Sequence, residues 1–462
     1  MRRLLAVIVS VFATAGFVAC TPPPAPVVGS PSGGDPYFPA AGNGGYDVTT
    51  YHLTLDYTPA TRALSGTAVI TARATARLSG FSLDLRDLTV ESITVNGQPA
   101  AFAQAGGELS ITPARTLPRG RTFVVVVEYG GTTGQPTDAT GALYGWVSYD
   151  DGAFVANEPE GASTWYPVND VPYDKARYEF EITVPDGTTA VANGDLVSTS
   201  SAGGLTTYRW VAQDAMASYL SMAATGDYVL TTSTTPDGLP IVNAVDEDFS
   251  AADLAAADAV LALQPEMIQF FEEAFGPYPF SSFGAVIDDD EDAGYALENQ
   301  TRPIYSGVPS EGTVAHELAH QWYGNKVTPL QWKDIWLNEG FATYAEWMWE
   351  EHRGGQTIQQ SFEQVMAIPD ASAFWTIVVA DPGAENLFAS AIYNRGAAFL
   401  QALRLTIGDD DFGTVLREWA ARSPNAPATT AQLLTLAEQV AGQQLDALFD
   451  AWLYQPTKPA AP

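Results

Sequence analysis

The stretch from His316 to Glu346 reads H-E-L-A-H-Q-W-Y-G-N-K-V-T-P-L-Q-W-K-D-I-W-L-N-E-G-F-A-T-Y-A-E. Its two histidines, His316 and His320, are four residues apart, so on a helix at about 100° per residue they differ by only about 40° around the axis. Neither Pro nor Gly separates them, which permits the helix. Both imidazoles would therefore leave one face and hold one metal ion, with Glu317 beside it as a base.

A catalytic zinc site takes three protein ligands and leaves its fourth position to water. Glu339 is the third candidate, because it follows His320 after eighteen residues and a Gly- and Pro-containing loop, where a second apolar-rich helix is predicted to begin. By composition, a chance H-E-x-x-H is expected in roughly one of five hundred such chains. We therefore interpret His316, His320 and Glu339 as metal ligands, and His52 and His352 as ordinary strand and surface histidines.

The stretch resembles the aminopeptidase N and leukotriene hydrolase family of zinc peptidases, the gluzincins. The resemblance rests on H-E-L-A-H, W-Y-G-N and W-L-N-E-G-F-A, and it extends over roughly residues 46–456. It implies a multidomain fold class in which an N-terminal β-rich, saddle-like domain precedes a thermolysin-like α+β zinc catalytic domain, with the C-terminal helical domain of larger relatives absent. It also implies one Zn²⁺ per chain as the cofactor.

The chemistry of such a site suggests further residues. Glu317 would take a proton from the zinc-bound water and hand it to the leaving amine. Glu346 lies two helical turns beyond Glu339 and matches the carboxylate that holds the outer ring nitrogen of a metal-bound histidine. Tyr393, in I-Y-N-R-G-A, matches the family's oxyanion-binding tyrosine, although Asn394-Arg395 replaces the family's Glu-Lys.

An aminopeptidase must also bind the free α-ammonium group of its substrate, and buried carboxylates are the physical means of doing so. Glu298, in G-Y-A-L-E-N, resembles the family's Gly-x-Met-Glu-Asn segment, with Ala296 on the same substrate-binding strand. Tyr295 stands where the family segment has its glycine, which is a departure from the pattern.

Glu158 resembles the family's second amine-binding acid. Glu160 would take this role instead if the alignment with the family segment shifts.

The pattern along the chain predicts two folded domains. Short runs of period two, separated by turn residues, indicate a β-rich N-terminal domain over residues 46–237. An Ala- and Leu-rich helical stretch over residues 251–275 and several later stretches at helical spacing indicate a catalytic domain over residues 238–456.

The first twenty residues have the pattern of a signal peptide, in which Arg2-Arg3 precedes a short apolar segment. Phe17-Val18-Ala19-Cys20 resembles a lipobox, whose cysteine becomes lipidated. The alternative is ordinary signal-peptide cleavage after Ala13-Thr14-Ala15. Residues 21–45 are rich in Pro and Gly and are predicted to form an extended tether. These segments predict an extracellular or cell-envelope protein whose only membrane contact is a lipid anchor at Cys20.

The chain carries 21 basic and 54 acidic residues, a formal net charge of −33. No basic stripe exists to neutralise phosphates, so nucleic acid is not expected as a partner. The predicted partners are peptides with a free N-terminus, and the predicted function is that of a secreted or lipid-anchored zinc aminopeptidase. Two alternatives remain: a zinc endopeptidase of the same fold, and a non-catalytic binding protein on this scaffold.

An acidic run from Asp288 to Asp292 precedes the strand that carries Glu298. Charge runs usually face water, so a solvated loop or an incidental calcium-binding loop is one interpretation. The other is that the run places negative potential at the mouth of the substrate cleft. That potential would favour peptides with an N-terminal Arg or Lys, and salt would weaken the preference.

Overall fold

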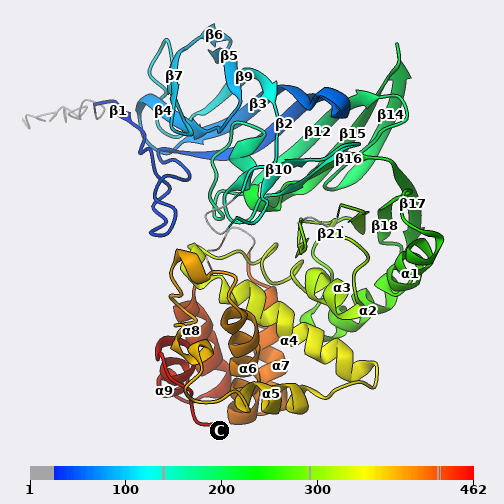
Figure 1. Ribbon diagram of the computed structural model, residues 1–462. Coiled ribbons are helices and arrows are strands. Elements are labelled where there is room, and N and C mark those ends of the chain that lie inside the picture. Colours follow the sequence, from blue (N-terminus) through cyan, green and yellow to red (C-terminus); the bar gives the residue numbers. More distant parts are fainter. Residues whose placement is uncertain (1–24, 138–140, 291–292, 424–425, 427) are drawn as a thin grey trace, which may run out of the picture.

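The computed structural model describes residues 25–137, 141–290, 293–423, 426 and 428–462. Figure 1 shows a β-rich N-terminal part, coloured blue to green, and a C-terminal part made largely of helices, coloured yellow to red. The predicted signal peptide and Cys20 lie outside the described residues. Among the described residues, no helix has the length and apolar character needed to cross a bilayer.

The largest sheet of the N-terminal domain has eight strands in the order β14-β15-β12-β2-β3-β9-β5-β6. In its central strand β2, Tyr51, Leu53 and Leu55 are buried while their neighbours are partly exposed, as expected for a strand with one face on the core. The period-two runs in the sequence therefore correspond to this sheet. The strands are β2 (Tyr46–Thr58), β3 (Ala63–Ala74), β5 (Thr89–Val95), β6 (Gln98–Pro99), β9 (Thr122–Thr132), β12 (Ala176–Pro185), β14 (Asp195–Ala202) and β15 (Leu205–Met216).

Two four-stranded sheets complete this domain, in the orders β1-β4-β8-β7 and β10-β11-β16-β13. In the second of them, strands β10, β11 and β16 are buried along their whole length, so both of their faces are covered. The strands of the first are β1 (Val27–Val28), β4 (Leu78–Asp84), β7 (Ala101–Ala105) and β8 (Glu108–Thr112). Those of the second are β10 (Gly145–Ser148), β11 (Ala153–Ala156), β13 (Thr189–Ala192) and β16 (Ala223–Gly226).

The segment predicted to be a free tether is docked on the protein over its described part, residues 25–45. Strand β1 pairs with β4. A carboxylate oxygen of Asp35 accepts a hydrogen bond from the backbone N–H of Trp332 at 2.8 Å, and the hydroxyl of Tyr37 accepts one from Gly383 N at 3.0 Å. The prediction of a tether was wrong here because the Pro- and Gly-rich composition does not reveal these anchors in the catalytic domain.

The catalytic domain begins with a five-stranded sheet in the order β17-β18-β19-β21-β20. The chain enters this sheet just after Asp227, since β16 belongs to the N-terminal domain and β17 to the catalytic sheet, so the change of sheet precedes the predicted boundary at residue 237. The strands are β17 (Tyr228–Thr234), β18 (Pro240–Asp246), β19 (Phe283–Asp288), β20 (Ala296–Leu297) and β21 (Ile304–Ser306).

Helices form the rest of the catalytic domain, and α1 and α2 divide the helical stretch predicted over residues 251–275. Figure 1 shows α3 beside the five-stranded sheet, and α4 packs against both α3 and α6. The helices are α1 (Ala251–Leu261), α2 (Gln264–Phe275), α3 (Glu311–Ala319), α4 (Trp336–His352), α5 (Ile358–Met366), α6 (Ser390–Ile407), α7 (Asp409–Ala420), α8 (Thr430–Ala441) and α9 (Asp446–Phe449).

Helices α4 and α6 approach each other through two glycines. A Cβ added to Gly396 would lie 2.9 Å from Cα of Gly340, and one added to Gly340 would lie 3.0 Å from Cα of Gly396. Both obstacles are backbone atoms, which cannot move aside as a flexible side chain can. Glycine at these two positions therefore sets the separation between the helix that carries Glu339 and the helix that carries Tyr393.

We expect Gly396→Ala to force α6 away from α4. It should lower the free energy of unfolding by about 1–3 kcal/mol, the usual cost of overpacking, and lower turnover by displacing Tyr393. Gly413→Ala in α7 is the matched control, because its new Cβ would meet only the end of the Arg417 side chain, at 3.3 Å. Urea unfolding and kcat/KM measure both effects. Equal stability and activity in Gly396→Ala and wild type would show that the helix separation is not set here.

Candidate metal centre

The histidines are presented by α3, which begins directly after Ser310. The Ser310 hydroxyl accepts a hydrogen bond from the backbone N–H of Thr313 at 3.0 Å and so caps the helix. His316 and Glu317 lie within α3, and His320 is the residue that follows its last turn. Gly324 lies in the turn that follows α3 and has a φ of +126°. A Cβ at this position would lie 3.3 Å from Nδ1 of His320. This close approach explains the glycine in W-Y-G-N.

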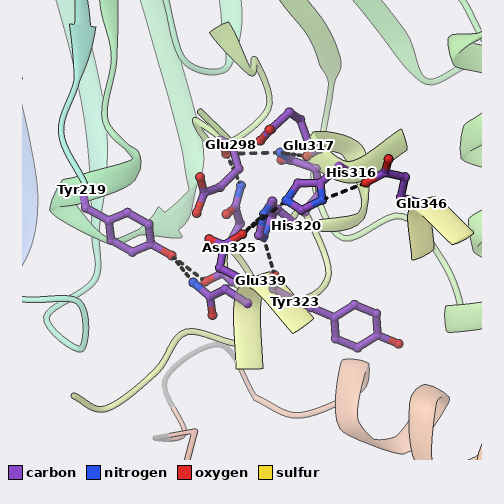
Figure 2. A network of polar contacts seen from close by, with 12 residues as sticks. Tyr219, Glu298, His316, Glu317, His320, Tyr323, Asn325, Glu339 and Glu346 are labelled. Atoms are coloured by element: carbon purple, nitrogen blue, oxygen red, sulfur yellow. Dashed lines mark hydrogen bonds and ion pairs between the residues drawn. The ribbon is translucent and has the colours of Figure 1, made fainter. Parts of the chain in front are cut away.

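Three side chains meet in the geometry of a zinc site. Nε2 of His316 lies 3.2 Å from Oε2 of Glu339, and Nε2 of His320 lies 3.5 Å from the same oxygen (Figure 2). Two donors bonded to one tetrahedral zinc ion at about 2.0–2.1 Å are about 3.3 Å apart. The donor set of two imidazoles and one carboxylate, at these separations, therefore fits a catalytic zinc ion without rearrangement.

The outer nitrogen of each imidazole also has a partner. Nδ1 of His320 lies 3.0 Å from the backbone oxygen of Tyr323, and Nδ1 of His316 lies 3.6 Å from Oε2 of Glu346. Acceptors at these positions favour the proton on Nδ1 and leave the Nε2 lone pair free for a metal ion. The structure thus places Glu346 where the sequence predicted it, next to a ligand and partly exposed.

Three further carboxylates surround the ligands. Ligand atoms of Glu158, Glu298 and Glu339 lie within 4.8 Å of one another, and so do those of Glu298, Glu317 and His320. Oε1 of Glu158 and Oε1 of Glu298 are both buried and have no hydrogen-bond partner. Burial, the largest cause, raises the pKa of Glu158, and the charges of Glu298 and Glu339 raise it further. The site therefore crowds carboxyl groups together, and a bound cation would stabilise their charged forms.

Glu317 is placed to handle protons. It is buried beside the two histidines, and burial raises its pKa to about 7, although the charges of His316 and His320 oppose the shift. A general base works best when its pKa is near the working pH. The positive charge of a metal ion beside it would bring this pKa down and favour the carboxylate form.

Tyr393, near the start of α6, lies over His316. The two ring centroids are 6.0 Å apart, and the ring planes differ by 25°. Burial raises the pKa of Tyr393, and the charges of Glu339 and Glu158 add to this effect, so the phenol stays protonated. Its hydroxyl is thus a hydrogen-bond donor at the edge of the metal site.

Arg86 distinguishes the surroundings of Glu160 from those of Glu158, the two candidates for the second amine-binding acid. Nη1 of Arg86 lies 3.5 Å from Oε1 of Glu160, so the Glu160 carboxylate pairs with Arg86 and not with the metal-ligand residues. Glu158 is the acid that joins the Glu298–Glu339 cluster. Ala296 is half-buried in the short strand β20, opposite Tyr305.

Four supporting residues were not assigned roles from the sequence. Asn325 Nδ2 and Gln321 Nε2 donate to the backbone oxygen of Glu298 at 2.7 and 3.4 Å, so the segment after α3 holds the Glu298 strand. From the N-terminal domain, Tyr219 donates to Gly324 O at 3.1 Å, and half-buried Lys175 donates to Asn325 O at 2.7 Å. Asn325 lies in the W-Y-G-N motif, whereas no sequence pattern distinguishes Tyr219 or Lys175.

Two family models match the chain. The Peptidase M1 N-terminal domain matches residues 48–220, and the Peptidase family M1 domain matches residues 260–452. The chain belongs to peptidase family M1. The predicted family is therefore confirmed, together with the predicted order of a β-rich domain followed by a catalytic domain.

The chain is similar to aminopeptidase N of Streptomyces lividans, with 25% identity over 438 residues, which are 88% of this chain and 50% of that protein. It is 30% identical over 281 residues to human endoplasmic reticulum aminopeptidase 1, over 55% of this chain and 29% of that protein. The chain spans about half the length of the first curated relatives it matches. Among solved structures, the chain is similar to the M1 zinc metallopeptidase of Deinococcus radiodurans, in a mutant bound to a Tyr-Ser-Ala substrate. The two superimpose with a TM-score of 0.85 and are 28% identical in sequence. The match covers 93% of this chain and 99% of that one.

We expect Glu346→Gln to weaken zinc binding by roughly 10–100-fold, because the carboxylate that orients His316 becomes a neutral amide. Glu418→Gln, on the exposed side of α7, is the control and should bind zinc as wild type does. Competition with a zinc-chelating dye measures the dissociation constants. The same affinity in both variants would remove Glu346 from the metal site.

Proposed function

We propose that this chain is a zinc-dependent aminopeptidase, which releases N-terminal residues from peptides. The observation that carries the proposal is the pair Glu158 and Glu298, each with a buried and unpartnered carboxylate oxygen, in one cluster with the metal ligand Glu339. A substrate α-ammonium group between these carboxylates would receive charge-assisted hydrogen bonds, which are stronger than neutral ones. Its scissile carbonyl would then lie next to the metal site.

His316, His320 and Glu339 would hold the zinc ion. When bound there, zinc lowers the pKa of its water and polarises the substrate carbonyl. Glu317 then accepts the proton of the attacking water and passes it to the leaving amine. The protonated hydroxyl of Tyr393 donates a hydrogen bond to the oxygen that becomes negative during attack.

The same acidic pair argues against the endopeptidase alternative. In an internal peptide segment, a neutral amide would take the place of the ammonium group. Glu158 and Glu298 would then stay buried without a countercharge. Leaving buried charges unpaired costs several kcal/mol, which corresponds to roughly 10²-fold or more in kcat/KM. An intact set of His316, His320, Glu339 and Glu317 likewise favours an enzyme over a non-catalytic binding protein.

We also propose that the protein is exported and held at the cell envelope by lipidation of Cys20. The support is the lipobox-like Phe17-Val18-Ala19-Cys20 after an apolar segment that follows Arg2-Arg3. In cells expressing the full chain, Cys20→Ser should move the protein from the membrane fraction to the soluble fraction. An unchanged distribution would remove the lipid anchor.

Replacing Glu317 by Gln should leave zinc bound at one equivalent and lower kcat by roughly 10²–10⁴-fold, because only proton transfer is lost. Metal content by elemental analysis and hydrolysis of a leucyl substrate measure the two effects. Loss of zinc in this variant would assign Glu317 to metal binding instead.

A substrate with a free N-terminus should be cleaved roughly 10²-fold or more faster than its N-acetylated form. Glu298→Gln should reduce this ratio by lowering kcat/KM for the free peptide alone. Glu160→Gln, whose carboxylate is paired with Arg86, should leave the ratio near its wild-type value. Equal rates on free and acetylated peptides in the wild type would favour the endopeptidase.

A further inference from the structure

Two features noted in the sequence have no part in the chemistry proposed above. The first is the acidic run at residues 288–292. Its first residue, Asp288, is buried at the end of β19 and accepts hydrogen bonds from two tyrosine hydroxyls, so it does not belong to a solvated loop. The last two residues of the run lie outside the described residues. The second feature is Asn394-Arg395, which stands where the family has Glu-Lys.

Arg395 is completely buried in α6, with 0% of its surface exposed. Its hydrogen-bond partners are five backbone oxygens, and over the described ranges of the chain none of the ion pairs includes it. Burial lowers the pKa of Arg395 to about 10, so the guanidinium group keeps its charge at neutral pH. Burying a charged group costs free energy unless hydrogen-bond partners surround it. The five acceptors offset this cost and fix the side chain in place.

The two arms of the guanidinium group contact two different segments. Nη1 donates to two backbone oxygens at the end of the short helix Ala373–Thr376, and Nη2 donates to three at the end of the last helical turn, Asp450–Tyr454. Carbonyl oxygens at a helix end lack partners within the helix and attract positive charge. The donor–acceptor distances are 3.1 and 3.2 Å to Trp375 and Ile377, and 3.3, 2.7 and 3.3 Å to Ala451, Gln455 and Thr457.

The ring of Trp375 contacts two cations at the same junction. Cζ of Arg395 lies 5.5 Å from the ring centroid, and Nζ of Lys458 lies 5.7 Å from it. A cation within about 6 Å of an aromatic face is attracted to it. Lys458 also donates to a carboxylate oxygen of Asp370 at 2.9 Å. The C-terminal segment 455–458 is therefore fastened to the catalytic domain around Arg395.

This junction lies behind the tyrosine of the metal site. Tyr393 precedes Arg395 by two residues, so at about 100° per residue the two side chains leave α6 about 200° apart. Tyr393 faces His316, and Arg395 faces the opposite side of the helix. The N-terminal end of α6 has no side-chain cap, because Ala389 occupies the capping position. The turn that carries Tyr393 therefore depends on contacts such as those of Arg395.

We propose that Arg395 is a positioning residue for Tyr393, which it holds at the metal site by tying α6 to the C-terminal segment 455–458 and to the end of the helix Ala373–Thr376. This role rests on the proposed function, in which Tyr393 donates a hydrogen bond to the oxygen that becomes negative. A lysine at this position would offer one ammonium group in place of a planar fork with two arms. It could not serve both segments in the same way.

The test compares Arg395→Lys in the full chain, alone and combined with Tyr393→Phe. Alone, it should lower kcat roughly 10-fold or more and leave KM and zinc content near their wild-type values, because a displaced donor acts in the transition state and not in substrate binding. In the Tyr393→Phe background it should change kcat by less than about twofold, since the donor is already absent. Arg404→Lys, paired with Asp409 in the last turn of the same helix, is the control and should retain wild-type kcat.

A general loss of structure would lower kcat by the same factor in both backgrounds. That result, or wild-type kcat in Arg395→Lys, would overturn the proposal. If Arg395→Lys does not fold, Trp375→Phe takes its place, because the smaller ring loosens the same junction. It should lower kcat roughly threefold or more only where Tyr393 is present, and equal losses in the two backgrounds would overturn the proposal.

Hydrogen exchange of the backbone amides separates this role from the proposed function. Amides of residues 392–396 should exchange roughly 10-fold faster in Arg395→Lys than in the wild type, and at the wild-type rate in Arg404→Lys. A wild type that cleaves no free peptide would refute the proposed aminopeptidase. Unchanged exchange in Arg395→Lys would overturn the role of Arg395, whatever the activity.

Discussion

Buried negative charge is the constraint on which the catalytic half of this molecule depends. Glu158, Glu298, Glu317 and Glu339 come from distant parts of the chain and meet around two imidazoles, where water cannot screen their mutual repulsion. Cations that enter this cluster would stabilise the charged forms of the carboxylates. One cation would be the metal ion between His316, His320 and Glu339, and in the proposed function the second would be the ammonium group of a substrate. The same crowding of carboxylates would then give the site its affinity for peptide N-termini.

The N-terminal domain is part of this arrangement. It supplies Glu158 to the acidic cluster, and Tyr219 and Lys175 donate hydrogen bonds to backbone oxygens of the segment that follows α3. That segment in turn holds the strand of Glu298 through Asn325. A shift between the domains would therefore displace Glu158 and Glu298 relative to the metal ligands.

The features of the site that depend on local spacing were predictable from the sequence. The His316–His320 repeat fixes one helical face, and Glu346 follows Glu339 by two turns, so the structure brings these residues together as expected. The family and the order of its two domains were predicted correctly on the same motifs. Residues 25–45 were mistaken for a tether because the hydrogen bonds of Asp35 and Tyr37 connect positions hundreds of residues apart. The role of Tyr219 likewise depends on how the two domains pack, which no local pattern records.

We expect His316, His320 and Glu339 to hold the metal ion. A competing set exists, because Glu298, Glu317 and His320 also bring three ligand atoms within 4.8 Å of one another. Anomalous diffraction at the zinc absorption edge, on crystals of the zinc-loaded protein, distinguishes the two sets. We expect one strong peak bonded to Nε2 of both histidines and to a carboxylate oxygen of Glu339, with Glu317 and Glu298 outside bonding distance. A peak bonded to Glu298 and Glu317, with His316 unbound, would contradict it.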